Sequence, residues 1–224
     1  MTTAIDDLTV LTATTEPWQL LYQDQDILVV NKPAMLLTVP GRHPRNHDCL
    51  ISRVQRDFPT AQVVHRLDYD TSGIVVLPLH KRALSELSKQ FQARTIDKQY
   101  QALVGGELHE AAGTIDLPIA ADPANRPLYK ICHTTGKASV THFQRLDYDS
   151  VQQLTRVALM PVTGRSHQLR LHLASMGHAI CGDTFYAKGA LATQSPRLCL
   201  HARWIKFCHP VSGRWLEFET AVPF

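Results

Sequence analysis

Residues 65–73 read HRLDYDTSG, and this stretch decides how the rest of the chain is interpreted. The runs on either side of it, residues 61–64 and 74–77, are apolar and contain β-branched residues, which favour β-strands. We therefore expect Asp68 to lie in a polar turn between two buried strands. Such turns often carry functional side chains, so this acid is the first candidate for chemistry.

Length and charge set broad limits on the protein. A chain of 224 residues suits one mixed domain, which we expect over residues 20–224, after an N-terminal arm over residues 1–19. Residues 1–30 hold five acidic residues and no Lys or Arg. The rest holds 23 basic and 15 acidic residues, a net charge of +8. This excess suits a polyanionic partner such as RNA or DNA, although many enzymes that never bind nucleic acid are as basic.

The cysteines and the hydropathy indicate the compartment. Five cysteines occur without any Cys-x-x-Cys pair: Cys49, Cys132, Cys181, Cys199 and Cys208. An odd set of this kind is typical of reduced thiols in the cytoplasm. The start of the chain lacks the basic and apolar regions of a signal peptide, and no segment has the length of a membrane span. We therefore expect a cytoplasmic protein.

The first half of the chain alternates strand and helix patterns. Residues 20–22 and 27–30 predict a hairpin, and the proline-rich, basic residues 34–45 predict a mobile loop. Apolar residues at helical spacing predict helices over residues 49–58 and 81–94.

Strand patterns dominate the second half. Alternating residues predict a strand over 98–104, and the turn residues within 107–137 predict a long excursion with one or two short strands. Residues 138–143 and 154–160 predict an antiparallel pair joined near Asp147. Further strands and a hairpin are expected beyond residue 198.

Asp68 has a near-copy elsewhere in the chain. Turn aspartates that only accept backbone hydrogen bonds are far commoner than catalytic ones. The pentapeptide RLDYD at residues 66–70 recurs at residues 145–149, but there no His precedes it and no Thr-Ser-Gly follows it. We interpret Asp147 as a structural residue at a hairpin tip, and the identity of the two pentapeptides as chance.

The second candidate stretch is TGRSHQLRLH, residues 163–172. It lies at the start of a helix expected over residues 165–176 and closed by Gly177. The polar residues could form no more than a solvated helix face. Against that alternative, an Arg165 directly after a glycine turn is well placed to aim a fixed cation at a carboxylate or phosphate.

Two further candidates are weaker. Tyr100 lies near the start of its strand and could simply pack in the core. A metal site could be imagined from one set of His and Cys residues: His178, Cys181, His201, Cys208 and His209. None of these residues shows zinc-finger or H-E-x-x-H spacing, so we expect no metal.

Taken together, the chain resembles the RluA-type pseudouridine synthase family. The motifs that carry the resemblance follow one another in the expected order over about residues 20–224: Asn31-Lys32-Pro33, His65-Arg66-Leu67-Asp68, Thr71-Ser72-Gly73, Lys98-Gln99-Tyr100, residues 163–170, Gly182-Asp183, Leu200-His201-Ala202 and His209-Pro210. Any one of these motifs would be weak evidence, whereas the ordered set is specific.

The resemblance implies a fold and a reaction. The fold is of the α+β class, with a mixed, largely antiparallel bent sheet, flanking helices and a central cleft that binds RNA. The reaction isomerises a chosen uridine to pseudouridine without metal or cofactor. The chain is similar to short family members that lack an N-terminal S4 RNA-binding domain. It departs from the family pattern at Met35, where a Gly is expected, and at Ala179, where a Pro is common; both departures put substrate detail in doubt.

The resemblance also implies roles for residues. Asp68 matches the catalytic aspartate, Tyr100 the active-site tyrosine, Arg165 the basic residue paired with that aspartate, and Leu169 an apolar position that packs against the base. We expect substrate contacts from a further set: Arg66, which could fill the space left by a flipped base, His65, Thr71, Lys32 and Arg42.

Several alternatives stay open at this stage. Asp68 could add to the base or ribose, or it could promote a glycal intermediate by deprotonation at C2′. The substrate could be a tRNA anticodon stem-loop, an rRNA hairpin or both, and we expect the protein to be a monomer. A non-catalytic RNA-binding or RNA-folding factor would not require the set of Asp68, Tyr100 and Arg165. Within the enzyme class, a hydrolase using Asp68 and a neighbouring His is the runner-up, but the sequence offers it no second, well-placed carboxylate and no nucleophile-elbow serine.

Overall fold

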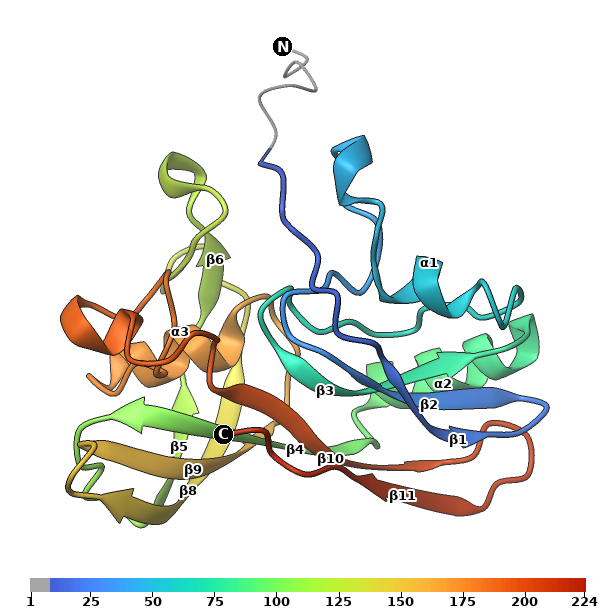
Figure 1. The fold of residues 1–224 in the computed structure, drawn as a ribbon. Coiled ribbons are helices and arrows are strands. Elements are labelled where there is room, and N and C mark those ends of the chain that lie inside the picture. The colour runs from blue at the N-terminus through green and yellow to red at the C-terminus, as the bar shows by residue number, and fades with distance from the viewer. Residues whose placement is uncertain (1–8) are drawn as a thin grey trace. The chain divides into compact units, whose positions relative to one another are not determined.

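The computed structural model describes residues 9–224 and groups them into two compact units (Figure 1). The first unit contains residues 9–96 and 204–220, and the second contains residues 97–203 and 221–224. One strand, β10 (Leu200–Cys208), passes from the second unit into the first. The expected single domain over residues 20–224 stays a prediction, and residues 1–8 of the expected arm lie outside the described residues.

The first unit is built on strands that follow the order β1, β2, β3, β10, β11. Their bounds are Gln19–Gln23 for β1, Ile27–Lys32 for β2, Ser72–Pro78 for β3 and Trp215–Glu219 for β11. The pairs β1–β2, β2–β3 and β10–β11 are antiparallel. All seven residues of β3 are buried, as expected for a continuous apolar run.

Two α-helices complete the first unit. Helix α2 (Lys81–Ala93) packs Ala83 and Leu87 against apolar residues of β2 and β3, which confirms the helix predicted from its spacing. Helix α1 covers only Leu50–Val54, so the prediction of a helix up to residue 58 was too long. A short 3₁₀ turn, Pro44–Asn46, lies in the loop before it.

The predicted strand at residues 61–64 is wrong. The amide of Ala61 donates to Phe58 O at 3.0 Å and that of Gln62 to Pro78 O, at the end of β3, at 2.8 Å, but among residues 9–224 the segment forms no strand. Only Ala61 of these four residues is buried, although Val64 packs partly against the core of the first unit. Asp68 therefore follows an irregular segment and precedes a single strand, β3.

The second unit has strands in the order β10, β4, β9, β8, β5. These are β4 (Asp97–Gly105), β5 (Ala112–Asp116), β8 (Val140–Asp149) and β9 (Leu154–Pro161), and the pairs β4–β9, β9–β8 and β8–β5 are antiparallel. The core of the unit is apolar and includes Leu159 from β9.

The remaining elements of the second unit are short. Strands β6 (Ile119–Ala121) and β7 (Tyr129–Ile131) form a separate hairpin. Together with β5, the predicted excursion over residues 107–137 therefore holds three strands, one more than expected. Two 3₁₀ turns cover Pro123–Asn125 and Gly189–Ala192. Helix α3 covers Gln168–Ser175, so it starts later than predicted.

These elements confirm the predicted fold class, a mixed and mostly antiparallel sheet with few helices. Within residues 9–224, none of the helices has the length and hydropathy that would let it cross a membrane.

His201 is a buried titratable group in the part of β10 that belongs to the second unit. Its side chain is 1% exposed, and burial lowers its pKa to about 4, helped by the positive charges of Arg197 and Arg203. In the unfolded chain His201 takes up a proton near pH 6.5. Between pH 6.5 and 4 the unfolded chain therefore binds more protons at His201 than the folded protein does.

We predict that stability falls as the pH drops through this window, by up to about 3 kcal/mol from His201 alone. Urea unfolding at pH 7 and pH 4.5 measures the loss, which should shrink in His201→Gln. The same change at the exposed His109 should leave the pH dependence as it is; an equal effect of both variants would refute the assignment.

Candidate active site

The turn that carries Asp68 is held by the loop after β2. Thr38 Oγ1 donates to Leu67 O at 2.8 Å and accepts from Leu67 N at 3.1 Å. On the other side of Asp68, Tyr69 O accepts from Leu36 N at 3.1 Å. Leu36 and Thr38 are buried, so the loop expected to be mobile packs its middle into the unit and fixes the backbone on both sides of Asp68.

The Lys32 side chain connects that loop to the Asp68 turn by hydrogen bonds to both. Its side chain is fully buried, and Nζ donates to Pro33 O at 2.8 Å, Leu36 O at 2.7 Å and Tyr69 O at 3.4 Å. An ammonium has three protons, and three carbonyls accept them here. Lys32 was predicted to contact substrate; that role stays a prediction, and its buried ammonium donates to backbone carbonyls here.

The Asp68 carboxylate does not close its own turn. The turn hydrogen bond runs from Thr71 N to the main-chain oxygen of Asp68 at 3.2 Å. Within the described part of the first unit, no backbone amide donates to the carboxylate. Asp24 behaves differently, since its Oδ1 accepts from Asp26 N at 2.8 Å and Ile27 N at 2.9 Å. The common structural role of a turn aspartate therefore fits Asp24 and not the half-buried Asp68.

Asp147, in the repeated pentapeptide, has a structural partner. It lies in β8 opposite Arg156 of β9, and Oδ2 is 3.5 Å from Arg156 Nε. The hairpin tip is three residues further on, and there Asp149 Oδ1 accepts from Val151 N and Gln152 N. The prediction that Asp147 is structural stands, but as a cross-strand ion pair and not as the tip residue.

The other predicted substrate residues of the first unit differ in exposure. His65 Nε2 accepts from Val76 N at 2.9 Å, and its ring packs on Phe91 with centroids 4.6 Å apart. Thr71 is 3% exposed. Arg66 and Arg42 are exposed, so these two are better placed to contact RNA than His65 and Thr71.

Arg165 lies in an open turn of the second unit, three residues before α3. Its Nε donates to Ala138 O at 3.4 Å, and the side chain is exposed. A Cβ added at Gly164 would meet nothing within 4 Å. The turn is held by Gln168, whose Oε1 accepts from Arg165 N at 3.0 Å.

Tyr100 and Leu169 belong to the second unit as well. Tyr100 pairs with Leu159 in the β4–β9 ladder and packs partly against the core. Leu169 is 7% exposed and is part of that core, so little of its side chain is left to contact a base.

Helix α3 is not a solvated face. Every residue from Gln168 to Leu173 is buried, including Arg170 at 1% exposure. Arg170 binds the buried Asp183 with two parallel hydrogen bonds, Nε to Oδ2 at 2.8 Å and Nη2 to Oδ1 at 2.6 Å. Its guanidinium lies over the ring of Phe185, 4.7 Å from the centroid. Arg170 is therefore a structural residue inside the motif.

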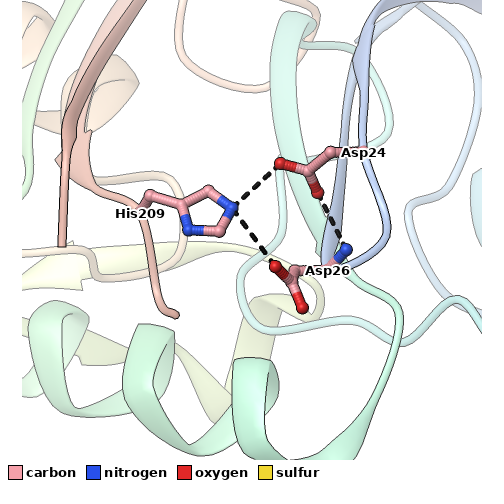
Figure 2. A group of neighbouring side chains, drawn as sticks. All are labelled: Asp24, Asp26 and His209. Atoms are coloured by element: carbon pink, nitrogen blue, oxygen red, sulfur yellow. Dashed lines mark hydrogen bonds and ion pairs between the residues drawn. The ribbon is translucent and has the colours of Figure 1, made fainter. Parts of the chain in front are cut away.

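Sequence patterns missed one polar cluster of the first unit, shown in Figure 2. Asp24, Asp26 and His209 bring possible metal-ligand atoms within 4.8 Å of one another. However, His209 Nδ1 accepts from Val211 N and Ser212 N, so the ring proton lies on Nε2. That nitrogen points at Asp24 Oδ2, 2.9 Å away, as a donor. A metal would need a lone pair there, so the cluster is better explained as a hydrogen-bonded joint between two turns.

The Asp24 carboxylate accepts several hydrogen bonds from protein groups in this joint. Burial raises its pKa, but bonds from Asp26 N, Ile27 N, the Tyr22 hydroxyl and His209 outweigh burial and lower the pKa below the usual range. Asp24 thus stays ionised and holds the β1–β2 turn.

Comparison with known proteins now identifies the protein family. Residues 26–175 match the family model described as RNA pseudouridylate synthase. The chain belongs to the RNA pseudouridylate synthase family. The dual-specificity RNA pseudouridine synthase RluA of Escherichia coli (strain K12) is 46% identical over 210 residues, 93% of this chain and 95% of the relative. Its namesake in Yersinia pestis is 49% identical over 204 residues, 91% of this chain and 98% of the relative.

A solved structure agrees with the family. Human RNA Pseudouridylate Synthase Domain Containing 1 superposes with a TM-score of 0.80 at 29% identity, covering 95% of this chain and 86% of that one. The family confirms the resemblance carried by the ordered motifs. The protein is an RNA pseudouridine synthase, an isomerase that acts on RNA, which favours the catalytic interpretation over a non-catalytic RNA-binding factor.

We predict that Lys32→Met lowers the free energy of unfolding by about 1–3 kcal/mol, because it leaves buried carbonyls without donors. Urea unfolding measures this loss. If Lys32 only holds backbone, the slope of log K for RNA against log salt stays unchanged in this variant.

Arg42→Ala is the comparison variant. If Arg42 contacts a phosphate, this change should make the slope less steep by about 1. An equal reduction in Lys32→Met would restore Lys32 as a direct phosphate contact.

Proposed function

We propose that this synthase converts a uridine in a structured RNA stem-loop to pseudouridine, with Asp68 as the catalytic carboxylate. One observation supports this choice of residue above all. The backbone around Asp68 is fixed on both sides, through Leu67 and Tyr69, while no backbone amide of the described first unit occupies the carboxylate. A reactive group needs this combination of a fixed position and unused hydrogen-bonding capacity.

The reaction breaks the C1′–N1 bond, rotates the uracil and rejoins it through C5. An ionised Asp68 can start either route, by adding to the base or ribose or by removing the C2′ proton to form a glycal. Neither route requires a metal or cofactor, and we propose that none takes part.

We propose supporting roles for residues of the second unit. The Arg165 guanidinium would supply positive charge to the reaction. Tyr100 would face the uracil or accept a proton during the rearrangement. The remaining exposed edge of Leu169 would provide an apolar wall for the detached base.

The substrate must present an unstacked uridine, because extruding a base from a helix costs roughly a few kcal/mol and costs least in a loop. Arg66 would fill the space that the flipped base leaves, and Arg42 would contact phosphate. The relatives in E. coli and Y. pestis are named dual-specificity enzymes, so we propose that stem-loops in both tRNA and rRNA are substrates here. We further propose that the enzyme works as a monomer in the cytoplasm, where its five free cysteines stay reduced.

We predict that Asp68→Asn reduces turnover at least about 1,000-fold, because it removes the group that reacts. Asp147→Asn keeps nearly full activity, because it removes only an exposed ion pair. The two changes are chemically the same and fall in identical pentapeptides. Pseudouridine mapping in tRNA and rRNA of cells that express each variant in place of the wild-type protein measures both effects.

Thermal unfolding and RNA binding of the purified variants show that loss of product does not follow from loss of fold or affinity. An active Asp68→Asn would refute the catalytic assignment, and an inactive but folded Asp147→Asn would show that the wrong copy had been chosen.

We predict that Arg165→Met lowers kcat by about 100-fold or more, since it removes a charge that stabilises the reacting carboxylate. Single-turnover assays on a short stem-loop measure it. Arg156→Met is the matched control in the same unit and should stay within about twofold of wild type. A normal rate for Arg165→Met would remove Arg165 from the mechanism.

A further inference from the structure

We propose that Gln168 is a positioning residue that holds the Arg165 turn in its catalytic conformation. This inference rests on the role proposed above for Arg165. Gln168 is the first residue of α3, is 4% exposed, and does not need to touch the substrate.

The side-chain amide of Gln168 makes four hydrogen bonds. Nε2 donates to Val140 O at 3.0 Å and to Thr141 Oγ1 at 3.0 Å. Oε1 accepts from Thr163 Oγ1 at 2.7 Å and from Arg165 N at 3.0 Å. A carbonyl can only accept and an amide N–H can only donate, so these partners fix which end of the amide faces which side.

These bonds connect the Arg165 turn to the sheet. Val140 and Thr141 lie in β8, whose backbone is fixed by pairing with β5 and β9. Thr163 is anchored in the same place, because its Oγ1 also accepts from Val140 N at 2.9 Å. The main chain closes the turn with a bond from Gln168 N to Arg165 O at 3.1 Å.

Packing does not hold this turn in place. Gly164 and Arg165 are exposed, and the space beside Gly164 is open for 4 Å. An exposed segment without apolar contacts keeps one conformation only if polar anchors specify it. Gln168 and Thr163 provide these anchors from the buried side.

The residue between the turn and the helix is strained, which increases the need for an anchor. His167 adopts the left-handed conformation, with φ 55° and ψ 16°, which costs a non-glycine residue roughly 1–2 kcal/mol. Its ring is held by Tyr186, whose hydroxyl is 2.8 Å from Nδ1. The Tyr186 hydroxyl in turn accepts from Tyr129 N at 3.0 Å. Without Gln168, relaxation at His167 would carry Arg165 away from its position.

The test is a double-mutant cycle of Gln168→Met and Arg165→Met, measured as single-turnover rates on a saturating stem-loop RNA. Methionine keeps the approximate size of glutamine and removes its hydrogen bonds. Misplacement of a catalytic group by about 1 Å can cost about 100-fold, so we expect Gln168→Met to lower the rate by about 10–100-fold with little change in RNA affinity.

The decisive result is the effect of Gln168→Met in the Arg165→Met background. If Gln168 acts through Arg165, adding Gln168→Met there changes the rate by less than about twofold. If Gln168 only supports the folded structure, Gln168→Met lowers the rate by the same factor in both backgrounds, and this result overturns the inference. A Gln168→Met rate equal to wild type overturns it as well.

Gln90→Met is the matched control for lost stability. Gln90 also clamps backbone with its amide, through Cys208 O at 2.8 Å and Cys208 N at 3.0 Å, but it lies in the first unit. It should lower stability and leave the rate of the folded fraction unchanged. If Gln168→Met does not fold, Thr163→Val replaces it in the cycle, because it keeps the approximate shape and removes the bond to Gln168 Oε1 together with the bond from Val140 N.

The outcomes also separate this inference from the proposed function. A normal rate for Arg165→Met refutes the role of Arg165, and then any loss in Gln168→Met must have another cause. A slow Arg165→Met together with multiplicative losses refutes only the positioning role of Gln168.

Discussion

The site of the first unit depends on one buried ammonium. Lys32 Nζ donates to three carbonyls, two in the loop after β2 and one at Tyr69 in the Asp68 turn. A buried charge is tolerated only when its hydrogen bonds are satisfied, so the two segments cannot separate without exposing or stranding it. The neighbouring bonds of Thr38 to Leu67 act in the same direction. The backbone of the Asp68 turn is thereby held on both sides, although it contains no regular structure.

Sequence patterns predicted the parts of the fold whose stability is local. Helix α2 has a clear apolar face, and the β1–β2 hairpin has apolar strands around a polar turn, so both were found at nearly their true bounds. Residues 61–64 have the composition of a strand but make a single backbone bond to the end of β3 instead of a ladder, and composition cannot reveal which neighbours are present. Helix α3 starts late for a similar reason, since the conformation of His167 depends on Tyr186, 19 residues away.

The two RLDYD pentapeptides show how little of a functional site is local. One copy lies in an irregular turn held by Lys32 and Thr38, and the other is part of strand β8 and pairs with Arg156. Identical residues therefore adopt different structures because their tertiary partners differ. The order of distant motifs identified the family, which the pentapeptide alone could not. The burial of Lys32 and its three bonds to backbone carbonyls were likewise not visible in its motif.

Apolar and polar residues have different tasks in both units. Apolar side chains stabilise the strands and α2 by forming continuous buried clusters, and the hydrophobic effect that holds these clusters does not depend on direction. Polar networks occur where a turn must keep one conformation at the surface: Lys32 at the Asp68 turn, the Asp24 joint, and Gln168 at the Arg165 turn. Hydrogen bonds are directional, so they can specify an exposed backbone that the hydrophobic effect cannot. On the roles proposed for Asp68, Arg165 and Gln168, the buried polar residues next to exposed turns, more than the core residues, would determine whether this synthase is active once it is folded.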